Sequence, residues 1–129
     1  MTQSTLSNTP LTLTRIDSGD VSILRLSGDL DGQHMADAKT TLANLFGEGR
    51  KKILFDLGKV AYIDSSGLGF FIGALKKARE VKGCVKLLGL NAYMLGIFRL
   101  INLDRILDIY DDEKAALASF GTSSSASAS

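Results

Sequence analysis

The sequence predicts an α/β fold with a mixed, mainly parallel sheet of about five strands and four helices. Short apolar runs alternate with segments of helical periodicity, in the order β β α β α β α β α. Only the turn-forming segment Asp17–Asp20 separates the first two runs, which is typical of an antiparallel hairpin. Each later strand is followed by a helix, and such crossover connections require parallel strands.

The boundaries of the elements come from apolar spacing and from local start and stop signals. Gly47 and Gly83 end the first two helices, and Asn91 can cap the third. The acidic run Asp111–Glu113 places negative charge where the last helix begins, which the helix dipole favours. Strands are expected at 11–16, 21–26, 53–57, 85–88 and 106–109, and helices at 33–46, from the 64–67 turn to about 82, at 91–100 and from 111–113 to 120.

The chain of 129 residues fits one domain. Residues 1–10 are polar and end at the single proline, so they read as a flexible arm. The Ser/Ala-rich segment 121–129 is expected to be a disordered tail. A compact domain therefore spans 11–120. The helix at 91–100 is apolar on several sides, and Leu95 and Leu100 are predicted either to pack on the last helix or to form a self-association surface, which would make a homodimer.

Composition excludes several classes of function. The net charge is +1 without a basic block, which argues against nucleic acid as a partner. No apolar stretch reaches the length of a membrane span and residues 1–10 lack the features of a signal peptide, so a cytoplasmic location is expected. Cys84 is the only cysteine and is predicted to be a small buried hydrophobe. Metal-ligand spacings are absent, and no cofactor is expected.

The segment Asp64–Gly67 lies where a buried strand gives way to a helix. Unpaired N–H groups at a helix start favour a phosphate, and either serine can serve as the cap. Gly67, Gly69 and Gly73 lie in the first turns although glycine destabilises a helix, which suggests close approach by another protein. On a helical wheel Phe70 falls opposite the core face, beside Gly73, and is predicted to belong to a contact patch.

The run Tyr62-Ile-Asp-Ser-Ser-Gly-Leu-Gly69 closely resembles the signature of STAS-domain anti-anti-sigma factors, which antagonise anti-sigma kinases. The resemblance spans roughly 11–120. Further segments that share it are Leu26-Ser-Gly-Asp-Leu-Asp31, Val60–Ile63, Lys82-Gly83, Asn102-Leu103 and Ala115–Leu117.

The resemblance implies the STAS fold and a phosphorylation switch on Ser65. In such proteins the unmodified form binds an anti-sigma factor that is also a serine kinase and thereby frees a sigma factor. Phosphorylation of the serine dissolves that complex, and a serine phosphatase of the metal-dependent PP2C type resets it. The chain itself is then not an enzyme. The partner-binding residues expected from this resemblance and from the motif are Asp31, Asp64, Ser66, Gly67, Gly69, Phe70 and Gly73, with Asp64 ordering the loop and Ser66 capping the helix.

Three other functions are weighed against this one. A serine hydrolase would need His34, the only histidine, as its base, and the sequence lacks the Gly-x-Ser-x-Gly elbow. A nucleotide site would need the lysine and the glycines of a phosphate loop, which the motif does not have. The third alternative is a non-enzymatic STAS subunit of a stress-signalling or lipid-transport complex.

Overall fold

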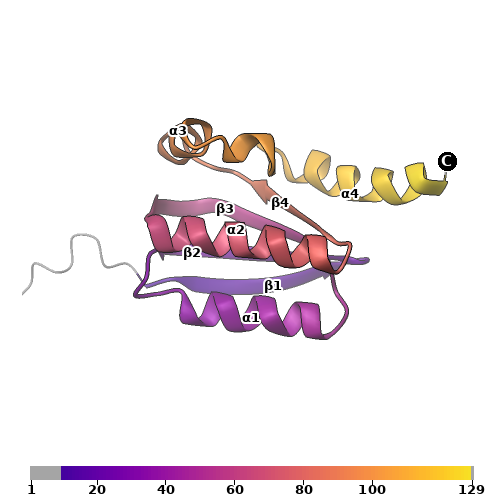
Figure 1. The fold of residues 1–129 in the computed structure, drawn as a ribbon, viewed down its shortest axis with the longest axis horizontal. Coiled ribbons are helices and arrows are strands. Elements are labelled where there is room, and N and C mark those ends of the chain that lie inside the picture. Colours follow the sequence, from indigo (N-terminus) through magenta and orange to yellow (C-terminus); the bar gives the residue numbers. More distant parts are fainter. Residues whose placement is uncertain (1–9, 129) are drawn as a thin grey trace, which may run out of the picture.

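The computed structural model describes residues 10–128, and within them a five-stranded sheet and four α-helices confirm the predicted fold class and order (Figure 1). The strands are β1 (Thr12–Ser18), β2 (Val21–Leu30), β3 (Lys52–Ile63), β4 (Cys84–Leu88) and β5 (Asp108–Tyr110). The helices are α1 (Ala36–Gly47), α2 (Ser65–Glu80), α3 (Ala92–Leu100) and α4 (Glu113–Ala128), with a 3₁₀ turn, η2 (Leu103–Arg105). None of the helices in the described part of the chain has the length and apolarity that crossing a membrane requires.

The strands lie in chain order across the sheet, from β1 to β5. β1 and β2 are antiparallel, as the hairpin prediction requires, and all later pairs are parallel. β3 is longer than the predicted 53–57, because it continues past exposed Gly58 and Lys59 with shifts of register against β2. Leu30 and Ile63 pair at the ends of β2 and β3, so the loops that follow these two strands meet at one edge of the sheet.

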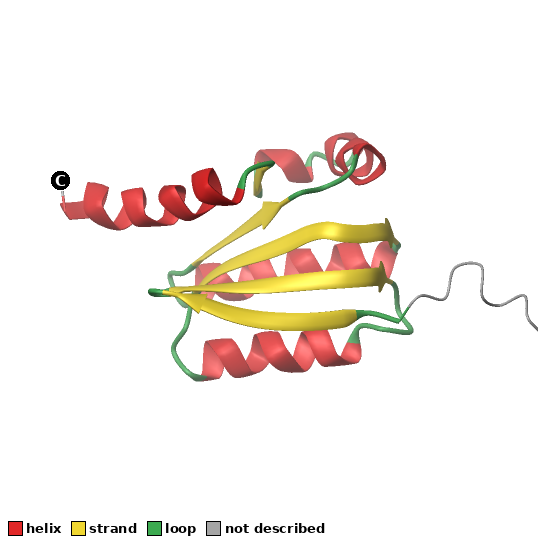
Figure 2. Ribbon diagram, turned by 180° about the vertical axis from the view of Figure 1, so that it is seen from behind, coloured by secondary structure: helices red, strands yellow, loops and turns green. Residues whose placement is uncertain are grey.

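The two faces of the sheet are covered differently. The larger core lies on the face of α1 and α2 and also includes Met94 and Phe98 of α3. Figure 2 shows the strands in front of both helices, which places α1 and α2 on the same face. On the other face α4 buries Ala116 and Phe120 against a smaller core that includes Leu54.

Three expectations, two for the last third of the chain and one for its first residues, need correction or qualification. Leu100 does not pack on α4: it is 82% exposed, because α4 covers the opposite face of the sheet. Self-association through this surface stays a prediction. The backbone of 121–128 continues α4 where a disordered tail was expected, since adding a residue to an existing helix fixes few further dihedrals. The predicted arm lies outside the described residues except for Pro10.

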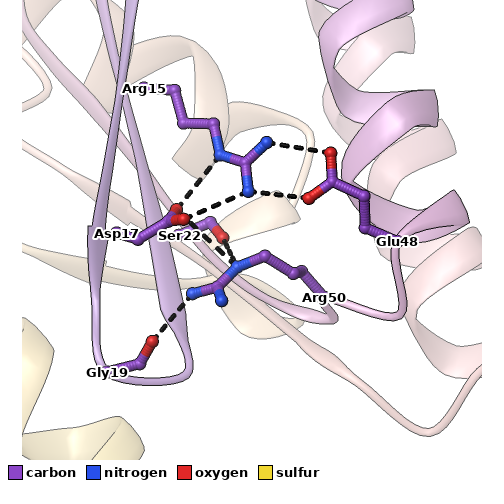
Figure 3. A network of polar contacts seen from close by, with 6 residues as sticks. All are labelled: Arg15, Asp17, Gly19, Ser22, Glu48 and Arg50. Atoms are coloured by element: carbon purple, nitrogen blue, oxygen red, sulfur yellow. Dashed lines mark hydrogen bonds and ion pairs between the residues drawn. The ribbon is translucent and has the colours of Figure 1, made fainter.

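A cluster of hydrogen bonds and ion pairs connects the β1–β2 hairpin to the loop that follows α1 (Figure 3). The Arg15 guanidinium donates to the carboxylates of Asp17 and Glu48, at 2.8–3.1 Å. Arg50 donates to the Gly19 carbonyl at 2.9 Å and to the Ser22 hydroxyl. Hydrogen bonds from Arg15 hold the pKa values of both Asp17 and Glu48 below their ordinary range.

Replacing Arg15 by glutamine is expected to destabilise the protein more at pH 7 than at pH 3. Both carboxyl groups have lower pKa values in the folded than in the unfolded chain, so their contribution is present at neutral pH and fades as the pH falls below about 4. Urea midpoints of both proteins at the two pH values measure this. The control is Arg105→Gln, which removes the same charge from an exposed site. If Arg15→Gln lowers the urea midpoint equally at both pH values, the proposed stabilisation by ionised Asp17 and Glu48 would be wrong.

Candidate functional site

Ser65 is the first residue of α2 and is exposed, directly after the buried end of β3. The residue that caps the helix is Asp64, whose carboxylate accepts from the backbone N–H groups of Ser66 at 2.8 Å and Gly67 at 3.2 Å. The prediction that Ser66 would cap α2 is therefore wrong. Asp64 has extended backbone angles, φ −115° and ψ −170°, which direct its side chain over the first turn as a helix cap requires.

The loop between β2 and α1 lies against the start of α2. Asp64 joins the two segments: its backbone N–H donates to the Leu30 carbonyl at 3.1 Å, and its carboxylate accepts from the Gly32 N–H at 3.4 Å. A Cβ on Gly32 would lie 2.9 Å from the Ser66 Oγ, so a side chain there would require this hydroxyl to move. The prediction that Asp64 orders the loop agrees with these contacts.

Asp31 lies in this loop and uses its carboxylate locally. The carboxylate accepts from the backbone N–H groups of Gln33 and His34 at 3.0 and 3.1 Å, and it lies 2.9 Å from His34 Nδ1. The Asp31 side chain is only 15% exposed. Asp31 therefore supports the loop beside α2, and its contact with a partner stays a prediction. Asp29, one position before the end of β2, is buried.

The glycines of α2 have two different roles. Gly67 is buried, and a Cβ there would lie 2.6 Å from both Ile63 Cγ1 and the Leu30 carbonyl oxygen. Gly67 thus lets the helix pack on the strand ends and does not open the surface to a partner, which corrects the predicted role. Gly69 and Gly73 are exposed, and a Cβ at either would meet nothing within 4 Å.

Phe70 is not part of an exposed patch. Its side chain is 7% exposed and packs edge-to-face against Phe55 and Phe71, with ring centroids 5.5 and 5.3 Å apart. The helical wheel assigned only the sheet-facing stripe to the core. The buried arc of α2 is wider than this stripe and includes Phe70 and Ala74.

Sequence reasoning missed an aromatic pair beside Ser65. Tyr62 and Tyr93 stack with centroids 6.5 Å apart and an interplanar angle of 13°, and they are 39% and 49% exposed. The Tyr93 hydroxyl donates to the Ile63 carbonyl at 3.3 Å. Tyr62 lies next to the last residue of β3 and therefore close to the start of α2, and partial burial and then the carboxylate of Asp64 raise its pKa. No sequence pattern links two tyrosines on separate elements.

His34 and Cys84 are the two side chains that the sequence analysis considered for chemistry beyond phosphorylation. His34 Nδ1 lies 2.9 Å from the Asp31 carboxylate, and within the described residues no hydrogen bond joins His34 to Ser65. Burial raises the pKa of the half-buried Cys84 thiol, which keeps it protonated at neutral pH. In the part of the chain that the structure describes, no three His, Cys, Asp or Glu side chains lie together as metal ligands would.

Comparisons with known proteins agree with the fold and with the motif. The family model for the STAS domain matches residues 13–116. A Bordetella bronchiseptica protein named "Putative anti-sigma factor antagonist BtrV" is 28% identical over 112 residues, which are 87% of this chain and 95% of that protein. The anti-sigma-B factor antagonist of Staphylococcus epidermidis is 25% identical over 99 residues, covering 77% of this chain and 92% of the relative.

Among solved structures, an anti-sigma factor antagonist from Mycobacterium paratuberculosis superposes with a TM-score of 0.75. The aligned part covers 84% of this chain and 92% of that one at 21% identity, so this likeness concerns the fold. The family model covers most of the described chain, and the mixed five-stranded sheet with four helices is the architecture that the sequence predicted. The chain belongs to the STAS domain family.

Proposed function

We propose that this chain is an anti-sigma factor antagonist whose binding is switched by phosphorylation of Ser65. The unphosphorylated form binds an anti-sigma factor that is also a serine kinase, and the sigma factor is released. The relatives that match most of the chain carry the name of anti-sigma factor antagonists, which supports the binding activity. The observation that carries the switch is the exposed Ser65 hydroxyl at the first position of a helix of 16 residues, next to the fixed carboxylate of Asp64.

The local electrostatics suit a reversible phosphate. In the kinase step the Ser65 oxygen takes the γ-phosphoryl group of ATP, ADP leaves, and the hydroxyl proton passes to a base of the kinase. The phosphate carries about −1.5 to −2 charges at pH 7, and the positive end of α2 stabilises it in the free protein. Asp64 Oδ1 already accepts the N–H groups of Ser66 and Gly67, so the phosphate points outward into the partner surface. A PP2C-type phosphatase returns Ser65 and inorganic phosphate by attack of water.

Phosphate mapping tests the switch. The purified chain is incubated with ATP and host extract, and the modified residue is identified by mass spectrometry. We expect one phosphate on Ser65, lost in Ser65→Ala and retained in the neighbouring variant Ser66→Ala. A phosphate confined to Ser66 or to the serines of 121–129, or none at all, would contradict the switch and favour the non-phosphorylated subunit of a larger complex.

Tyr62→Ala is expected to weaken binding to the anti-sigma factor about tenfold. The half-exposed Tyr62–Tyr93 stack borders the Ser65 surface, and rigid aromatic side chains dominate protein interfaces. Titration calorimetry with the unphosphorylated chain measures the affinity. The matched control is Ile16→Ala, which removes an apolar side chain of equal exposure (39%) from β1 and is expected to change the affinity less than about twofold. Equal losses in both variants would place the interface elsewhere.

A further inference from the structure

A groove of about 560 Å³ runs between α1 and α2, on the face of the sheet that these two helices cover. Its apolar lining includes Leu42 and Phe46 of α1 and Phe70 and Ala74 of α2. Pockets of this size and lining are typical of small-molecule sites. The groove does not take part in the contacts that order the start of α2, so it needs a separate explanation.

Two glycines create the hollow. Gly69 and Gly73 lie one turn apart on the groove side of α2, and a Cβ at either would have no atom within 4 Å. Neither glycine has a positive φ, so the backbone does not require them. Glycine in a helix interior is unfavourable relative to alanine. The packing of the protein therefore gains nothing from either glycine, whereas the groove depends on the space that both leave open.

The charges along the groove have one sign. Among the described residues that line the groove, Lys39 on α1 and Lys77 on α2 are the ionisable ones. Lys77 has one weak partner, Glu80 at 3.7 Å, and both of these side chains are more than half exposed. An apolar floor between two ammonium groups complements a ligand with a hydrocarbon body and an anionic end.

The length of the groove indicates which class of ligand fits it. The lining extends along α2 from Gly69 to Val81, which is about 18 Å at the rise of an α-helix. This length suits an extended acyl chain. We propose that the groove binds a single-chain anionic amphiphile of the fatty-acid class, with its carboxylate at Lys39 or Lys77. Gly69 lies one turn beyond Ser65, so an occupied groove adjoins the surface proposed for the anti-sigma factor.

Dodecanoate, used below its micelle concentration with the full chain, tests the proposal. We expect saturable 1:1 binding by calorimetry, at least about tenfold tighter than binding of dodecyltrimethylammonium, which has the same chain and the opposite charge. Chemical-shift changes are expected at the Leu42 and Ala74 methyl groups. The double variant Lys39→Gln, Lys77→Gln should bind dodecanoate and dodecanol equally.

Gly73→Leu fills the groove and is expected to reduce dodecanoate affinity at least about tenfold while raising the melting temperature, because leucine favours the helix more than glycine does. The matched control is Gly96→Leu in α3, where a Cβ also meets nothing within 4 Å; it should bind as the parent does. No saturable binding, equal affinity for both surfactants, unchanged binding by Gly73→Leu, or binding only of an acidic helical peptide would overturn the proposal. None of these readouts depends on phosphorylation of Ser65.

Discussion

Phosphorylation of Ser65 is expected to weaken binding to the anti-sigma factor at least about 100-fold, or roughly 2.7 kcal/mol. Two effects add. The phosphate brings about two negative charges beside Asp64, whose carboxylate is held in place by the N–H groups of Ser66 and Gly67. It also carries a hydration shell into a surface whose neighbouring rings, Tyr62 and Tyr93, are half exposed and available for contact. Titration calorimetry with the phosphorylated and the unmodified chain measures the difference.

Substitutions separate charge from loss of the hydroxyl. Ser65→Ala should bind within about threefold of the parent, since a neutral small residue leaves the surface unchanged. Ser65→Glu, with one charge, should lose about tenfold. The control for added charge is Ser18→Glu, exposed at the hairpin turn where β2 begins, at the opposite end of the sheet from Ser65. Equal binding by the phosphorylated and unmodified chains, or a loss by Ser18→Glu as large as that by Ser65→Glu, would refute a local switch at Ser65.

Most of the fold follows from local patterns in the sequence. Alternating apolar runs and helical segments predicted all five strands and four helices of the described chain, because burial on one or both faces sets their periodicity. The errors concern tertiary context. Gly58 and Lys59 end an apolar run without ending β3, since backbone pairing with β2 continues where side chains are exposed. Packing on the last helix was one of the two alternatives predicted for Leu100, but α4 lies on the far face of the sheet and Leu100 is exposed.

The candidate site was predictable to a smaller extent. The motif located Ser65 at the start of a helix, because a strand, a polar turn and a glycine-rich helix follow one another in the sequence. The choice of cap between Asp64 and the serines depends on the backbone angles of Asp64. Phe70 packs on Phe55 of β3, and the Tyr62–Tyr93 stack joins residues of β3 and α3. Such contacts between distant segments leave no periodic signal in one sequence.

Gly67→Ala is expected to lower the free energy of unfolding by about 2–3 kcal/mol, the usual cost of overpacking a filled site. The new Cβ would lie 2.6 Å from the Leu30 carbonyl oxygen and from Ile63 Cγ1. Neither can yield easily: the Leu30 carbonyl accepts from the Asp64 N–H, and Leu30 and Ile63 pair at the end of the sheet. Relief of the clash would therefore shift the start of α2 and disturb the cap. Urea unfolding followed by circular dichroism measures the loss.

Gly69→Ala is the matched control, two residues further along the same helix. Its Cβ would meet no atom within 4 Å, so only helix propensity acts and the protein should gain roughly 0.5–1 kcal/mol. The same substitution is thus expected to change the free energy of unfolding in opposite directions at two nearby positions. Helix propensity alone cannot produce that difference. If Gly67→Ala were as stable as the parent, the close packing of α2 on β2 would be wrong. If both variants lost stability equally, the cause would be a general intolerance of α2 to side chains, and Gly67 would have no special place in positioning Ser65.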